Sequence, residues 1–154
     1  MRYKFEEINK KVILAIDIFF KNDAILLELD VNERTISYKI AEYLQTQFPE
    51  WHVDCEYNRK ENDIKRLSKI NECDEQRKSD RIYPDIIVHH RGIEDNLLVI
   101  EIKTNNQDDP CDRKKLELLT KKEGEYGYDW GVYIQFNGVK SPKLVWYRDG
   151  EKYD

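Results

Sequence analysis

Charged side chains interrupt two apolar segments of this sequence. Asp85 precedes the run Ile-Ile-Val, and Glu101 and Lys103 lie in the segment 97–103. Burying an unpaired charge in a strand is costly. Two carboxylates and a lysine on such a scaffold indicate a metal site for phosphate chemistry. The alternative is a buried ionic network, in which Lys103 neutralises one carboxylate and no chemistry takes place.

A hairpin around the turn at Gly92 would bring the two carboxylates together. In an antiparallel pair the numbers of opposed residues have a constant sum, so a turn centred on residue 93 pairs Asp85 with Glu101. Their Cβ atoms would then lie roughly 4.5–5.5 Å apart. Lys103 shares the face of Glu101, because side chains alternate with a period of two. Magnesium, with manganese as a substitute, could use both carboxylates and the main-chain carbonyl of Ile102.

Glu33 is a third candidate carboxylate. It lies on the same helical face as Ile36 and Ile40, which predicts that it faces the sheet. It would lie close to the hairpin only if this helix packs on the face that carries the carboxylates. Asp30 and Glu33 also match the spacing of a capping box, in which Glu33 would only stabilise the start of the helix. Both interpretations stay open.

Apolar periodicity predicts the elements that must position these residues. Helical spacing is present in three segments: 4–21, 33–48 and the segment that begins at Asp108. Strand patterns are present in five segments: 52–57, 83–91, 96–103, 131–136 and 143–147. Residues 24–29 could extend a helix or form a short strand. We therefore expect alternating helices and strands around one sheet.

The segment 58–81 differs in composition from the rest of the chain. It is strongly polar and rich in lysine and arginine, with apolar residues spaced for one short amphipathic helix. It is either a solvated connection or a flap that contacts a nucleic-acid backbone. Arg81, Lys114 and Lys115 could touch flanking phosphates, although each could equally be a solvated surface cation. Gln135 could reach the same site from its strand, with packing or exposure as the alternative.

Length and composition favour one globular domain. The chain has 154 residues, of which 40% are hydrophobic and 37% charged, enough for a substantial core. There is no membrane-spanning run and no signal-peptide pattern, which predicts a cytoplasmic location without membrane partners. The three cysteines are far apart in sequence, so we expect reduced thiols and no structural zinc. A net charge of −5 argues against a passive binder of polyanions.

The sequence resembles the PD-(D/E)XK nuclease superfamily. The resemblance rests on Pro84-Asp85, on Glu101-Ile102-Lys103 in the next strand, and on Glu33 in the preceding helix. It covers roughly residues 30–136, with 1–29 as an N-terminal helical extension of a single domain, 1–154. It implies an α/β fold: a restriction-endonuclease-like three-layer sandwich with a mixed central β-sheet flanked by helices.

The resemblance also implies an activity. Asp85 and Glu101 would bind magnesium, Glu33 would assist, and Lys103 would orient or activate the attacking water. The chain would then be a metal-dependent nuclease acting on nucleic acid, with DNA expected. A homodimer is one option, because cutting two strands commonly needs two copies related by a two-fold axis. The alternative is a catalytically inactive module with the same fold that binds nucleic acid or a protein partner.

Overall fold

The computed structural model describes residues 2–57, 59–60, 63–64, 83–105 and 110–154. The helices in these ranges are α1 (Phe5–Asp23), α2 (Ile25–Glu28), α3 (Glu33–Gln47) and α4 (Pro110–Thr120). The strands are β1 (His52–Cys55), β2 (Arg59–Lys60), β3 (Asp63–Ile64), β4 (Ile86–His90), β5 (Asp95–Lys103), β6 (Trp130–Asn137), β7 (Lys140–Arg148) and β8 (Glu151–Tyr153). The helix expected within 58–81, and Arg81 with it, falls outside the described residues.

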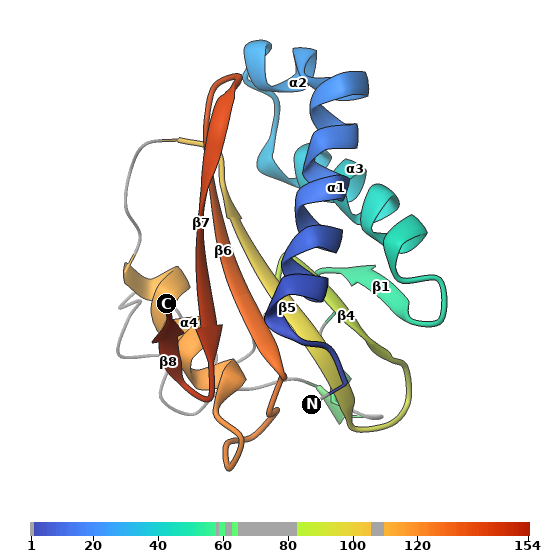
Figure 1. The fold of residues 1–154 in the computed structure, drawn as a ribbon, viewed down its shortest axis with the longest axis vertical. Helices are drawn as coiled ribbons and strands as arrows, with labels where there is room; N and C mark the ends of the chain where they lie inside the picture. The colour runs from blue at the N-terminus through green and yellow to red at the C-terminus, as the bar shows by residue number, and fades with distance from the viewer. Residues whose placement is uncertain (1, 58, 61–62, 65–82, 106–109) are drawn as a thin grey trace.

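Six strands form one mixed sheet in the order β1-β4-β5-β6-β7-β8. Strands β5 and β6 are parallel, whereas the other neighbouring pairs are antiparallel. Parallel neighbours need a crossover connection, and α4 is the helix in that connection. Helices α1 and α3 cover one face of the sheet and α4 covers the other (Figure 1). The short strands β2 and β3 form a separate two-stranded sheet.

The hairpin of β4 and β5 has the register that the turn predicts. Paired residues from Ile86 to Val88 have numbers that add up to 186, so the pairing is centred on residue 93. A bulge follows Val88, and Leu97 is the extra residue of β5. Period-two alternation would place Leu97 on the same face as Val99, but Leu97 packs in the cluster under α1 and α3. The bulge explains this difference, because it interrupts the alternation of side chains.

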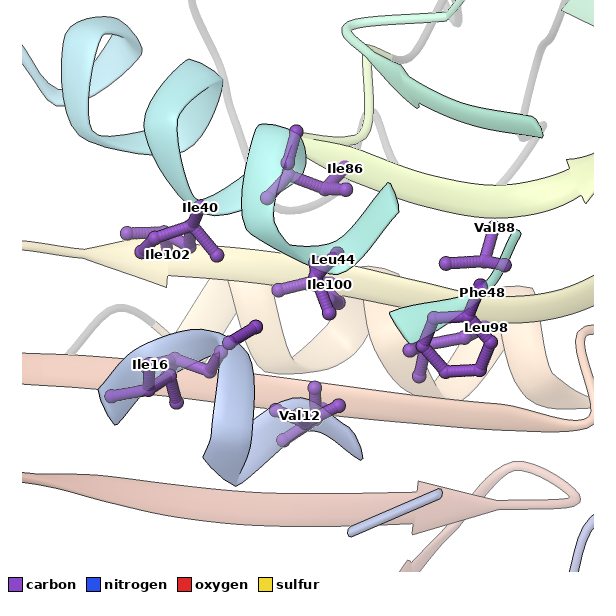
Figure 2. Close-up of a cluster of buried hydrophobic side chains, with 14 of the residues drawn as sticks. Val12, Ile16, Ile40, Leu44, Phe48, Ile86, Val88, Leu98, Ile100 and Ile102 are labelled. Carbon is purple, nitrogen blue, oxygen red and sulfur yellow. The ribbon is translucent and has the colours of Figure 1, made fainter. Parts of the chain in front are cut away.

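The main hydrophobic cluster lies between the sheet and helices α1 and α3. Figure 2 shows side chains of both helices packed on alternate residues of β4 and β5. A smaller cluster on the other face joins Val99 to Leu116 and Leu119 of α4. The first helix, expected as an extension outside residues 30–136, contributes Val12 and Ile16 to the main cluster.

The structure also bears on residues 24–29, on the C-terminal edge of the sheet, on the cysteines and on membrane spans. Residues 24–29, which were open between helix and strand, contain the short helix α2, and the edge strand β8 was not predicted. Cys111 is disulfide-bonded, so the expectation of reduced thiols is wrong there, whereas Cys55 is free. Within the described residues, no helix combines the length and apolarity needed to cross a membrane.

Candidate metal centre

Asp85 lies directly before β4 and contacts the neighbouring strand β5. Its Oδ2 atom accepts a hydrogen bond of 2.7 Å from the main-chain N–H of Ile102. Its own carbonyl accepts a hydrogen bond from the N–H of Glu56, which ties the end of β1 to this position. Because Ile102 follows Glu101, these bonds hold Asp85 beside the second carboxylate. The structure therefore brings together the two residues that the hairpin arithmetic paired.

Glu101 is buried near the end of β5, on the sheet face that α4 covers. Only 1% of its surface is exposed. Its Oε1 atom lies 2.8 Å from Nζ of Lys115, but off the direction of a hydrogen bond, so no described residue gives Oε1 a well-directed donor. Burial raises the pKa of Glu101 well above its usual range, Lys115 opposes this, and Asp85 and Asp112 add to it. The carboxylates of this site therefore need a positive partner.

Helix α4 supplies that partner and a further acid. Lys115 pairs with Glu101, and Asp112 lies 3.4 Å from Nζ of Lys103. Burial alone lowers the pKa of Lys115, but Glu101 more than offsets this and the pKa is raised. The charge cluster, as we call it, thus has three carboxylates and two ammonium groups: Asp85, Glu101, Asp112, Lys103 and Lys115.

Both lysines of the charge cluster lie beside carboxylates of the protein. Lys115 was expected as a cation at the rim that touches substrate phosphates, but its side chain is only 14% exposed and points at Glu101. Lys103, which the alternative of an ionic network pairs with one of the two carboxylates, has its Nζ atom 3.4 Å from the carboxylate of Asp112. The sequence signal for both was the i, i+3 spacing of Asp112 and Lys115 on the helix after β5, which places them on one helix face.

Close packing of α4 on the sheet fixes these positions. Leu116 and Leu119 are fully buried against Val99 of β5. Strand β6 approaches the end of the helix at Gly131, where a Cβ atom would lie 2.8 Å from Cγ2 of Thr120. A residue without a side chain is needed at this point, because the helix leaves no room for one. The helix face that carries Lys115 is thereby held on the sheet.

Glu33 reaches the centre from the opposite side of the sheet. Its Oε2 atom accepts hydrogen bonds from the hydroxyl and the N–H of Thr104, at 3.1 and 3.3 Å. The condition that α3 packs on the face with the carboxylates is not met, because α3 covers the other face (Figure 1). Glu33 instead contacts Thr104, the residue that follows β5. Asn32 is the N-cap, so Glu33 occupies position N1 of the helix. It is therefore not the N3 glutamate of a capping box that begins at Asp30.

A cavity connects Glu33 with Asp85. It has a volume of about 230 Å³, and its lining includes both carboxylates together with Arg34, Tyr38 and Glu56. The side chain of Arg34 is largely exposed and pairs with Glu56 at 3.1 Å. The cavity gives the half-buried Asp85 access to solvent, whereas Glu101 does not line it.

The remaining predicted contacts lie at the margin of the centre. Gln135 is the ladder neighbour of Lys103 in β6, and its side-chain amide donates to the carbonyl of Asn105 at 3.3 Å. Lys114 is exposed on α4. Ile102, whose carbonyl was expected as a metal ligand, contacts Asp85 through its N–H.

The candidate ligands of the centre are the two carboxylates of Asp85 and Glu101. Among the described residues, no group of three or more histidine, cysteine, aspartate or glutamate side chains could hold a metal ion. Magnesium, however, is commonly held by one or two carboxylates, with water and substrate phosphate completing its shell. Oε1 of Glu101, buried without a directed donor beside Asp85, offers such a ligand. No family model, no curated protein and no solved structure matches the chain.

Proposed function

We propose that the chain is a metal-dependent nuclease that hydrolyses phosphodiester bonds, with DNA as its substrate. The observation that carries this proposal is the placement of Asp85 against β5 beside the buried Glu101, with Lys103 two residues further along. The mixed sheet with helices on both faces is consistent with a PD-(D/E)XK protein of the restriction-endonuclease-like fold.

The residues of the centre would have distinct roles. Asp85 and Glu101 would hold magnesium, with manganese as a substitute. When bound, such an ion activates water for in-line attack on the phosphodiester and stabilises the leaving oxygen. Lys103 would orient the attacking water and place positive charge near the phosphate in the transition state. Glu33 holds Thr104 at the end of β5, and this contact would keep the backbone beside Lys103 in place.

Cleavage of DNA by the purified chain tests this proposal. In magnesium or manganese we expect cleavage that EDTA abolishes. Asp85→Asn has nearly the same shape as the wild type but one negative charge fewer, and it should lower the rate about 100-fold or more. Asp17→Asn makes the same chemical change at an exposed position of α1, on the opposite face of the sheet, and as the matched control it should retain activity. An Asp85→Asn variant that cleaves as fast as the wild type would contradict the proposal.

One observation favours a second candidate, the non-catalytic module. Both lysines of the charge cluster have carboxylate partners within the protein, so the cluster is partly neutralised without any metal. If the chain is such a module, the wild type and Asp85→Asn should bind DNA or a protein partner with the same affinity. Neither form should cleave DNA in magnesium or in manganese.

A further inference from the structure

The position of Lys115 is unusual for a lysine on a helix surface. Its side chain is 14% exposed and its ammonium group lies 2.8 Å from a carboxylate that is 1% exposed. Asp85 and Asp112 also act on this ammonium group. The positive charge therefore lies among three carboxylates, at the place where the carboxylate pair would otherwise need a cation.

The ion pair is poorly suited to a purely structural role. A buried ion pair must offset the cost of removing both charges from water, which requires good hydrogen-bond geometry. Oε1 of Glu101 has no well-directed donor among the described residues, despite the short distance to Lys115. The contact compensates the charge of Glu101, and a divalent cation beside Asp85 would compensate that charge as well.

The lysine side chain is also able to move. It is a compact charge on a flexible four-carbon stem, and the side chain is 14% exposed. Asp112, one turn before Lys115 on the same helix face, is 18% exposed and is already close to Lys103. Withdrawal from Glu101 would therefore leave Lys115 near a second carboxylate and near water.

We propose that Lys115 is a built-in counter-ion of the metal centre. Its ammonium group neutralises Glu101 in the metal-free protein and leaves that carboxylate when a divalent cation binds. Lys115 therefore sets the metal affinity of the site, because a divalent ion must displace it and is repelled by it. This inference rests on the proposed metal centre and adds a positioning residue to it.

The affinity for Mn²⁺ alone tests the inference. Isothermal titration calorimetry compares the wild type with Lys115→Met, which keeps the length of the side chain and removes its charge. We expect Lys115→Met to bind Mn²⁺ about tenfold more tightly, because a like charge close to the ion has been removed. In EDTA the same variant should unfold at a lower temperature, with a larger upward shift on addition of Mn²⁺.

Two further variants make this comparison secure. Lys114→Met removes an exposed charge from the adjacent position and should leave the Mn²⁺ affinity at the wild-type value. If Lys115→Met does not fold, Lys115→Gln replaces it, because glutamine remains polar beside Glu101 and has no charge. Unchanged or weaker Mn²⁺ binding by the folded Lys115 variant would overturn the inference.

The outcomes also separate this inference from the proposed nuclease function. Equal Mn²⁺ affinities for wild type and Lys115→Met, with intact DNA cleavage, would overturn the role of Lys115 alone. Tighter Mn²⁺ binding by the variant, without cleavage by any form, would support Lys115 as counter-ion and contradict the nuclease. No Mn²⁺ binding by either protein would overturn both.

Discussion

Replacement of Gly131 by alanine tests whether close packing of α4 holds the charge cluster together. The added Cβ atom would lie 2.8 Å from Cγ2 of Thr120 and 3.3 Å from Cδ2 of Leu116. Thr120 cannot simply rotate away, because its hydroxyl donates to the carbonyl of Leu116 at 2.8 Å and accepts from the N–H of Gly150 at 3.1 Å. The helix or the strand must therefore shift.

The expected magnitude follows from two opposing effects. Ordinary carbon contacts begin near 3.4 Å, so the pair must separate by several tenths of an ångström. Overpacking of this kind costs about 1–3 kcal/mol. Alanine also reduces the freedom of the unfolded chain, which stabilises by about 0.4–1 kcal/mol where the backbone is compatible. The overpacking is larger, so Gly131→Ala should lower the free energy of unfolding by about 1–2 kcal/mol.

Urea denaturation followed by circular dichroism measures this change, and a second substitution identifies its cause. Thr120→Ser removes the methyl group that the alanine would strike and keeps the hydroxyl. Gly131→Ala combined with Thr120→Ser should therefore be more stable than the sum of the two single changes, with a coupling of about 1 kcal/mol. A Gly131→Ala variant as stable as the wild type, or no coupling with Thr120→Ser, would refute this account of the packing.

Two predictions concern pH and the edge of the sheet away from the centre. Although burial alone raises the pKa of Asp54, Arg91 and His89 bind its carboxylate and hold that pKa well below its usual range. The stabilisation that the ionised Asp54 provides is therefore present above about pH 4 and is lost as the pH falls. Asp54→Asn should lower the free energy of unfolding by about 1–3 kcal/mol at pH 7 and make the loss of stability in acid smaller. Urea midpoints measured across pH test both expectations. An acid profile that Asp54→Asn leaves unchanged would contradict this prediction. The hydrogen bond of 2.6 Å that Nδ1–H of His90 donates to the carboxylate of Asp95 raises the pKa of His90. The stabilisation from this pair is therefore complete below about pH 6.5 and is lost as the pH rises through the folded pKa. NMR titration of the imidazole should show that raised pKa, and Asp95→Asn should lower it; a folded His90 that titrates at or below about 6.5 would contradict this.

The hairpin was the most predictable part of the fold. Its register follows from the turn and from period-two alternation, which are local, and the pairing from Ile86 to Val88 confirms it. Helix α3 was also predictable, because Ile36 and Ile40 repeat at helical spacing and both are buried. The bulge at Leu97 was not predictable, since no residue of that segment signals an extra position.

The composition of the charge cluster depended on packing between distant elements. Several cations surround Lys115 in the sequence, and helical periodicity alone does not fix which of them meets Glu101. That choice depends on how α4 sits on the sheet, which Gly131 and the buried Leu116 determine. For the same reason the sequence predicted that Glu33 would face the sheet but not on which side α3 would pack.

Crystals of the wild-type protein soaked in Mn²⁺ would test the central claim most directly. The account predicts an anomalous difference peak in contact with the carboxylates of Asp85 and Glu101, with the ammonium group of Lys115 moved away from Glu101. The absence of a peak at these carboxylates at saturating Mn²⁺, with Lys115 still paired to Glu101, would contradict it.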